Sequence, residues 1–136
     1  MFKISPIQDE NTKNKYAEMC GTVSIPQYFA YQMINQDDNS LMAFSQFDIG
    51  KDDALISDLK EAAGLEDFEA MFILGRQTMN FIDLCGVHAC RATKNTASEK
   101  LLLSLGFKKT DSGDYFCDMT DMFSGNCSGE AVKLDT

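Results

Sequence analysis

The sequence predicts an α+β (mixed α/β) domain in which helices flank one central, mostly antiparallel sheet. Residues 28–62 contain three apolar segments separated by short polar turns, the pattern of an antiparallel meander. Residues 66–84 carry apolar side chains at steps of three and four, which predicts a long, well-buried helix. With 136 residues, 44% of them apolar, the chain is long enough for one hydrophobic core. We therefore expect a single domain over residues 1–123 and a C-terminal tail over residues 124–136.

The N-terminal segment predicts one edge strand and one helix. FKISPI, residues 2–7, alternates in polarity, and Pro6 lacks the N–H that an inner strand would need. Residues 9–22 are polar, with a few apolar side chains at helical spacing, and Gly21 stands near their end. A strand followed by a helix is therefore expected before the meander.

The meander is predicted by the composition of its strands and by its turns. The three strands are YFAYQMI (28–34), LMAFSQFDI (41–49) and ALISDLKEA (54–62). The polar clusters NQDDNS and GKDD separate them, and such clusters favour tight turns between antiparallel strands.

After the long helix, the sequence predicts a strand, a helix and a hairpin. Gly86 is a natural helix stop, and VHACRA (87–92) follows as a short strand, which we expect to run parallel to the third meander strand. A helix is expected over residues 95–105. FKKTD and YFCDM, separated by the turn residues SGD, predict an antiparallel hairpin.

The segment NTASEKLLLSLGF resembles a motif of the GNAT family of acetyl-CoA-dependent N-acetyltransferases, in which N-x-x-A-x-x-x-Y-x-x-x-G-F is common. Asn95, Gly106 and Phe107 match this pattern, Ser98 replaces its alanine by another small residue, and Leu102 stands where the tyrosine is expected. The order of the predicted elements resembles the family over nearly the whole chain. The resemblance implies a GNAT-like acyl-CoA N-acyltransferase fold.

Folding alone also explains the residues that match. Asn95 is able to cap a helix by accepting a backbone N–H bond. Ser98 is small enough for another segment to come close, and Gly106 with Phe107 would end the helix and fill the core. These residues therefore support the fold more directly than the activity.

Two departures from the family pattern concern chemistry. The resemblance implies a loop with glycines and a basic residue before the long helix, where backbone N–H groups bind the pyrophosphate of coenzyme A. The corresponding segment, EAAGLEDFEA, has one glycine, Gly64, and no basic residue, and it places Glu66, Asp67 and Glu69 in the expected first helical turn. Leu102 cannot donate the proton that the resemblance assigns to the tyrosine.

If acyl transfer is retained, the resemblance implies acetyl-CoA as the cofactor and places the site at the end of the third meander strand. The general base for an amine would be Asp58 or Glu61, and the alternative for both is an ordinary solvated carboxylate at a strand end. Backbone groups of residues 59–61 would receive the pantetheine arm. The candidate cofactor-binding residues are Leu59, Lys60, Glu61, Gly64, Asn95 and Ser98.

Charge and cysteine content argue against several other classes. The chain has 21 acidic and 12 basic residues, a formal net charge of -9, and no basic stripe, so we expect no nucleic-acid partner. No stretch approaches the ~18 apolar residues of a membrane span, and a cytoplasmic protein with reduced thiols is expected. Cys85, His88 and Cys90 lack a fourth ligand, so we interpret them as a core cysteine pair beside the only histidine and expect no metal.

Two functions of different classes remain open. The first is an acetyltransferase-like protein with a degenerate active site, which binds a small molecule or a protein and needs no cofactor. The second is an active N-acetyltransferase that uses acetyl-CoA on a small-molecule or protein amine. The sequence favours neither a monomer nor a homodimer.

Overall fold

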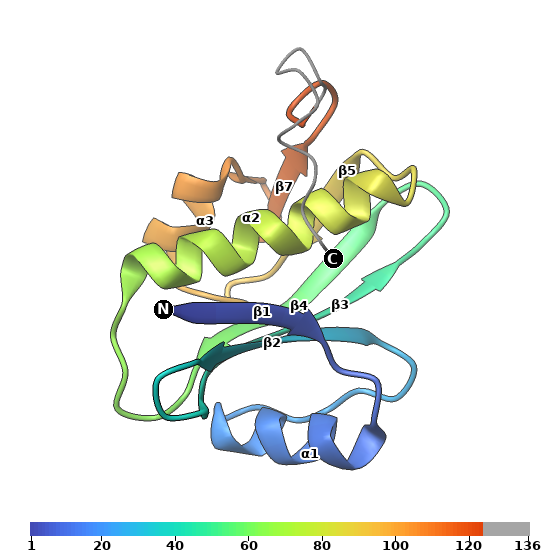
Figure 1. Ribbon diagram of the computed structural model, residues 1–136. Helices are drawn as coiled ribbons and strands as arrows, with labels where there is room; N and C mark the ends of the chain where they lie inside the picture. Colours follow the sequence, from blue (N-terminus) through green and yellow to red (C-terminus); the bar gives the residue numbers. More distant parts are fainter. Residues whose placement is uncertain (124–136) are drawn as a thin grey trace.

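The computed structural model describes residues 1–123 and places seven strands in one sheet, in the order β1-β2-β3-β4-β5-β7-β6 (Figure 1). The tail predicted for residues 124–136 lies outside the described residues. The elements are β1 (Phe2–Pro6), α1 (Glu10–Met19), β2 (Phe29–Asn35), β3 (Ser40–Ile49), β4 (Ala54–Glu61), α2 (Phe68–Leu84), β5 (Ala89–Ala92), α3 (Glu99–Leu105), β6 (Lys108–Lys109) and β7 (Tyr115–Asp118).

The sheet is antiparallel except where β4 and β5 run side by side. β2, β3 and β4 form the predicted meander, and β5 is parallel to β4, as predicted. Pro6 lies in β1, an edge strand of the sheet, which confirms the expectation drawn from its missing N–H. β6 and β7 form the predicted hairpin, although β6 has only two residues.

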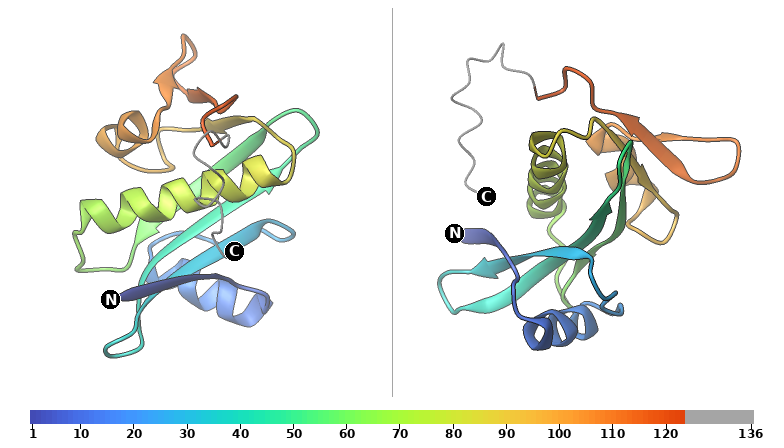
Figure 2. Two further views of the ribbon diagram at one scale, coloured as in Figure 1. Left: turned by 45° about the horizontal axis from the view of Figure 1, so that its top comes forward. Right: turned by 90° about the vertical axis from the view of Figure 1, so that its right-hand side faces the viewer.

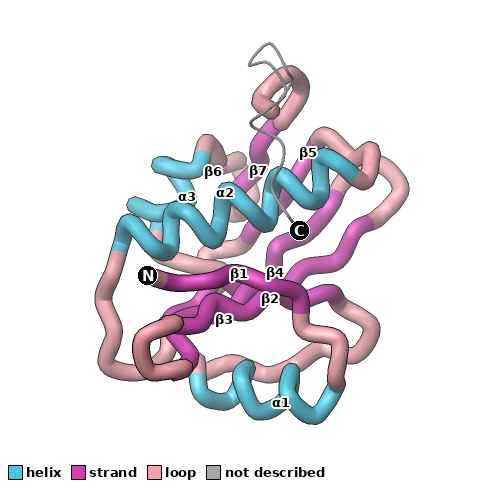
Figure 3. The backbone as a smooth tube through the Cα atoms, viewed as in Figure 1, coloured by secondary structure: helices cyan, strands magenta, loops and turns pink. Residues whose placement is uncertain are grey.

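Helices cover both faces of the sheet (Figures 1 and 2). α1 lies on one face and α2 on the opposite face, with α3 packed beside α2. Figure 3 shows how the strands pass between the two helical layers. The observed mixed sheet with flanking helices is the predicted fold class.

Side-chain caps fix where each helix begins. Asp9 caps α1 by accepting the Thr12 N–H at 2.9 Å. Ser98 caps α3 by accepting the Leu101 N–H, and Gly106 ends that helix in the left-handed conformation, at φ 112°. The expectation that Asn95 caps this helix was therefore wrong, and the helix starts at Glu99.

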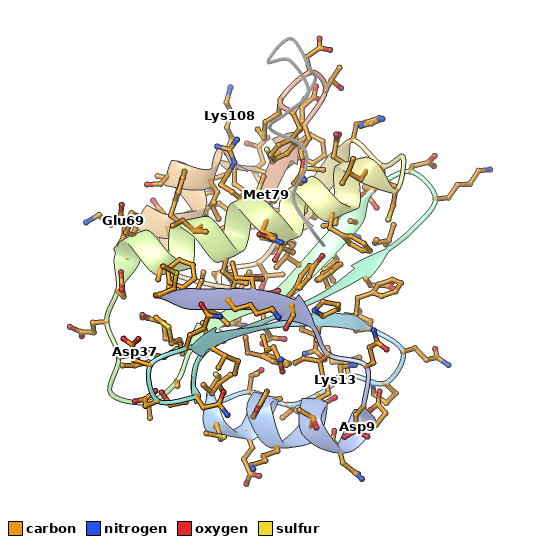
Figure 4. The ribbon with its side chains drawn as sticks, in the orientation of Figure 1. Asp9, Lys13, Asp37, Glu69, Met79 and Lys108 are labelled. Carbon is orange, nitrogen blue, oxygen red and sulfur yellow. The ribbon has the colours of Figure 1, made fainter. Side chains whose placement is uncertain are left out.

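The main core lies between the sheet and α2. The helix buries a stripe that consists of Ala70, Met71, Leu74, Gly75, Thr78, Met79, Asn80 and Ile82. A Cβ atom on Gly75 would lie 2.6 Å from Leu105 Cδ1 of α3, so the absence of a side chain allows the two helices to approach. Met79 belongs to this stripe (Figure 4).

The interpretation of Cys85, His88 and Cys90 as a core group was wrong in part. Cys90 is fully buried, whereas Cys85 is exposed at the end of α2 and His88 Nδ1 is hydrogen-bonded to Asp83 Oδ1 near the surface. Within residues 1–123, no group of His, Cys, Asp and Glu side chains is arranged to hold a metal ion. No helix in this range is long and apolar enough to cross a membrane.

Candidate functional site

β4 and β5 separate after three residue pairs, and this separation forms the candidate site. The parallel pairing covers Ala54 to Ile56 of β4. Beyond it, the loop of residues 93–98 takes the place of β5 beside β4. The Thr96 hydroxyl donates to the Ile56 carbonyl at 2.7 Å, and the Leu59 N–H donates to the Thr96 carbonyl at 3.0 Å. Thr96 therefore holds the two diverging segments together at the base of the separation.

A β-bulge in β4 decides which way its residues face. Opposite β3, the register passes from Gln46↔Asp58 to Phe47↔Ile56, so Ser57 is an extra residue. After the bulge, the Ala62 N–H still donates to β3, at Met42. Because backbone groups alternate along a strand, Leu59 and Glu61 direct their N–H and C=O groups away from β3, into the separation.

The separation contains a cavity of about 490 Å³. The Leu59 C=O and the Glu61 N–H face it, and neither group has a hydrogen-bond partner within residues 1–123. The Lys60 ammonium group donates to the Asn95 carbonyl and so links the two sides of the cavity. The lining residues are Leu59, Lys60, Glu61, Glu66, Asp67, Phe68, Met71, Lys94, Asn95, Ala97, Ser98 and Leu101.

Two backbone N–H groups at the N-terminal end of α2 donate hydrogen bonds to carboxylates of the protein. Glu61 Oε2 accepts the Asp67 N–H at 2.7 Å. Asp67 is itself the N-cap of the helix, and its Oδ1 accepts the Ala70 N–H at 3.0 Å. Glu69 lies at the same end of α2 and is exposed (Figure 4). Two of the donors that an incoming anion would use are thus bound to the protein's own carboxylates.

Asp58 has a different environment, although it is next to Leu59. Its side chain is only 6% exposed and accepts hydrogen bonds from Thr22 Oγ1, from Gln46 Nε2 at 2.8 Å and from Ser57 Oγ at 2.8 Å. Gln46 also accepts the Ile25 N–H at 2.7 Å. These bonds fasten the loop of residues 21–28 to the sheet and surround the carboxylate with donors.

The same loop is held from α1. Lys13 is 3% exposed, and its ammonium group donates to the carbonyls of Ile25 and Tyr28, each at 2.7 Å (Figure 4). A buried ammonium group with two carbonyl acceptors is a satisfied structural cation. The loop of residues 21–28 is therefore anchored at both of its ends.

The structure brings together some of the predicted site residues and leaves others out. Asp58 faces the loop of residues 21–28, and Gly64 lies in the turn before α2 without lining the cavity. Leu102, in place of the expected tyrosine, is buried in the main core. The predicted residues that line the cavity are Leu59, Lys60, Glu61, Asn95 and Ser98.

Sequence reasoning missed the residues that shape the site. Thr96 lies inside the recognised motif, but the motif assigns no role to its side chain, and Gln46 lies inside a predicted strand without any distinguishing pattern. Lys94 and Phe68 line the cavity, and the Lys100 ammonium group lies 4.9 Å from the centre of the Phe68 ring. This contact joins a lysine of one helix to an aromatic residue of another, and the spacing of residues along the sequence does not predict such tertiary contacts.

Two buried thiols near the sheet are poor nucleophiles. Burial, reinforced by the negative charge of Glu61, raises the pKa of Cys20 to about 12. Burial also raises the pKa of Cys90, beside Cys117 on the neighbouring strand. Both groups are neutral thiols at pH 7, and thiolate chemistry at these positions is disfavoured.

Comparison with solved structures identifies the fold. The ribosomal-protein-S18-alanine N-acetyltransferase from Escherichia coli gives a TM-score of 0.68 at 15% identity, over 88% of this chain and 94% of that one. An N-acetyltransferase from Staphylococcus aureus Mu50 gives 0.66 at 12% identity, over 89% and 99%. The NatC complex bound to Gag peptide and CoA gives 0.66 at 9% identity, over 86% and 98%.

These similarities show that the chain has the fold of the GNAT N-acetyltransferases, which confirms the fold implied by the sequence motif. No family model matches the sequence, and no curated protein matches it.

Proposed function

We propose that this chain, which has the GNAT fold, is a binding module that does not hold the pyrophosphate of coenzyme A at the N-terminus of α2. The observation that carries this proposal is the hydrogen bond from the Asp67 N–H to Glu61. The Glu61 carboxylate accepts a hydrogen bond from a backbone N–H at the position where the fold would bind a phosphate. No cofactor is needed for the function proposed here.

Electrostatics supports the same conclusion. Two unit charges about 4 Å apart interact by about 4 kcal/mol where the effective dielectric constant is near 20. A pyrophosphate at this end of the cavity would meet Glu61, Glu66 and Asp67, all of which line it. Solvent screens this repulsion at the exposed Glu66 and Asp67, and Lys60 and Lys94 also line the cavity. The remaining repulsion and the two backbone donors already bound to carboxylates both disfavour an anion at this helix N-terminus.

The cavity nevertheless retains groups that recognise an amide. The Leu59 C=O accepts and the Glu61 N–H donates, and both lie on the free edge of β4. An extended chain with amide groups is able to bond to both in the manner of a neighbouring strand. The ligand class is therefore a small amide-containing molecule or a segment of a protein.

Calorimetric titration with coenzyme A, acetyl-CoA and pantetheine tests the proposal. Pantetheine has the amide arm of coenzyme A without its phosphates. We expect coenzyme A to bind no more tightly than pantetheine, because the phosphates gain no contact at α2. Binding of coenzyme A in the micromolar range, about 100-fold tighter than pantetheine, would refute the proposal.

A pair of substitutions sharpens this test. Glu61→Gln combined with Asp67→Ser removes two negative charges, and serine keeps the helix cap. We expect the affinity for coenzyme A to rise about tenfold or more, while that for pantetheine stays the same. Glu69→Gln is the matched control, because it removes one exposed charge from the same turn without changing the cavity lining.

An active N-acetyltransferase is the second candidate function. The open cavity and the free backbone groups of Leu59 and Glu61 favour it, and Lys94 with Lys100 would supply positive charge for phosphates. Acetyl-CoA would then be the cofactor, Asp58 or Glu61 the base for an amine, and Asn95 a neighbour of the acyl arm. Thiol release from acetyl-CoA, measured with panels of amines and peptides, distinguishes the two functions. Rates above background that Asp58→Asn abolishes without unfolding the protein would favour the enzyme.

A further inference from the structure

We infer that residues 124–136 bind in cis to the outer face of α2, the side of the helix that carries Arg76 and Asn80. The Glu130 carboxylate accepts a hydrogen bond from Arg76, and a backbone carbonyl of the same segment accepts one from Asn80. This surface lies outside the cavity beside β4, so the inference goes beyond the proposed function and does not depend on it.

Two polar side chains of α2 have buried N–H groups that lack acceptors. Arg76 Nε and Asn80 Nδ2 are both buried, and neither has a hydrogen-bond partner in the described part of the chain. Asn80 is only 4% exposed. A buried donor without an acceptor destabilises a protein, especially when the donor is charged, and native structures nearly always pair such groups. We therefore expect an acceptor to lie over these two side chains.

Both donors lie on the side of α2 that faces away from the sheet. Thr78 marks the sheet side, because its hydroxyl oxygen lies 2.9 Å from that of Ser45 in β3. Successive helical residues are about 100° apart, so Arg76 and Asn80, each two residues from Thr78, point in nearly the opposite direction. Figure 2 shows that this side of α2 is turned away from the strands. The sheet therefore does not supply the acceptors.

The burial is confined to the middle of the outer face. Ile73 is 39% exposed and Leu84 is 55% exposed, whereas Asn80 lies between them in the helix and is almost completely covered. Phe123 reaches this middle part, since Arg76 Cζ lies 5.0 Å from the centre of its ring. The described chain thus ends beside one of the two donors, and the next segment of the chain starts there.

The charge of Arg76 favours a carboxylate as its acceptor. The ion pairs found within the described residues do not include this guanidinium group. Carboxylates form the strongest hydrogen bonds to guanidinium, because both groups are charged and planar. Glu130 and Asp135 are the acidic residues after Phe123. Glu130 is nearer to Phe123 along the chain and closes the smaller loop, which costs less conformational entropy.

The sequence between Phe123 and Glu130 is compatible with a chain that turns back over the helix. Gly125, Asn126 and Gly129 are residue types that favour turns. Covalent attachment at Phe123 also gives an effective concentration in the millimolar range for a short flexible connection. Even a weak contact between the carboxylate and the helix would therefore be occupied most of the time.

The test compares two arginines by NMR of the ¹⁵N-labelled full chain. Arg76 and Arg91 are the arginines of the sequence, and Arg91 Nε, which donates to Asp53 at 2.8 Å, is the internal reference. We expect Glu130→Gln to accelerate hydrogen exchange of the Arg76 Nε–H about tenfold and to leave Arg91 unchanged. Asp135→Asn is the matched control and should change exchange at Arg76 less than about twofold. Exchange at Arg76 that is equal in Glu130→Gln and in the parent chain would overturn the inference.

A nitroxide spin label on Cys127 tests the position of the segment in a second way. In the Cys85→Ser variant, every cysteine of the described part of the chain is buried, so the reagent should modify Cys127. We expect the label to broaden the side-chain amide signal of Asn80. The signal of Asn14 in α1, on the opposite face of the sheet, should keep its full intensity. An unchanged Asn80 signal would contradict the inference.

A mixed sample distinguishes binding in cis from binding between two copies. One half of the sample carries the spin label without ¹⁵N, and the other half carries ¹⁵N without the label. Binding in cis predicts no broadening of Asn80 in this mixture at any protein concentration. Broadening that appears in the mixture and grows with concentration would show that a second copy supplies the segment, and the assignment in cis would be wrong.

Discussion

Asp58 and Leu59 are neighbours in β4, yet they belong to two regions that differ in how their polar groups are used. On the side of Asp58, three side chains donate to one buried carboxylate, and the loop of residues 21–28 closes over it. On the edge of Leu59, a carbonyl and an N–H face a cavity without partners from the described chain. Polar groups that are already paired stabilise the fold, and groups that are left free are available to a ligand.

This difference separates stability from binding along a single strand. A substitution on the closed side, the side of Asp58, should lower the free energy of unfolding and leave the cavity intact. A substitution on the open edge, the edge of Leu59 and Glu61, should change ligand affinity with little effect on stability.

The largest effect is expected from Asp58→Ala. The substitution leaves the donors of Thr22, Gln46 and Ser57 without their acceptor in a buried position. We expect a loss of about 3 kcal/mol in the free energy of unfolding, measured by urea denaturation. The exposed Asp111→Ala serves as the control, with an expected change below about 0.5 kcal/mol. A loss of less than about 1 kcal/mol for Asp58→Ala would mean that the closed side is less tightly held than its hydrogen bonds indicate.

A smaller loss is expected from Gly75→Ala, which tests the packing of α2 against α3 and β4. The new Cβ would lie 2.6 Å from Leu105 Cδ1 and 3.2 Å from Leu59 Cδ2, so the Leu105 side chain or the helix itself must shift. Overpacking of this kind destabilises by about 1–3 kcal/mol, partly offset by the higher helix propensity of alanine. Thermal unfolding measures the net loss, and Leu105→Val in the same chain should recover part of it. A stabilised Gly75→Ala variant would contradict the close packing.

Glu61→Ala should have a modest effect on stability and a clear effect on binding. The Asp67 N–H loses its acceptor at a partly exposed position, which should lower the free energy of unfolding by about 1 kcal/mol. Because a negative charge leaves the α2 end of the cavity, affinity for an anion such as pyrophosphate should rise. Urea denaturation and calorimetry on one sample measure both quantities. Loss of stability without any gain in anion affinity would show that Glu61 does not control this end of the cavity.

Lys60→Met should produce the smallest change in stability, below about 0.5 kcal/mol, because an exposed ammonium–carbonyl bond contributes little. The methionine keeps the apolar stem but not the link to Asn95. Hydrogen exchange of the Leu59 amide, which donates to Thr96, should accelerate roughly twofold as the loop of residues 93–98 loosens. Exchange unchanged from the parent chain would show that Thr96 alone holds the two segments.

The sequence predicted the elements well wherever one local pattern governed them. The meander follows from apolar strands between polar turns, and α2 follows from its stripe of apolar residues. The motif that begins at Asn95 gave the correct fold, although its cap is Ser98 and not Asn95. Residues 93–97 form a turn before the helix because Thr93 Oγ1 accepts the Asn95 N–H and Thr96 bonds to β4.

The orientation of Asp58 and the closure around it could not be predicted. A one-residue bulge at Ser57 reverses which face each following residue meets, and no composition marks a bulge. Ser57 is next to Asp58 in the sequence, but Thr22 and Gln46 come from two other segments and become neighbours of the carboxylate only in the folded chain. The contact between Glu61 and Asp67 is different, since the acidic first turn of α2 already suggested a site unfavourable to anions.

The two outer strands of the sheet bear on the behaviour of the protein at high concentration. β1 ends at Pro6, which offers no N–H to a further strand, and β6 consists of Lys108 and Lys109, both exposed. Joining two copies through β6 would bring lysine side chains of like charge together, and joining through β1 would lack a hydrogen bond. Both outer strands therefore disfavour pairing with the sheet of another copy, although each of them is an exposed edge.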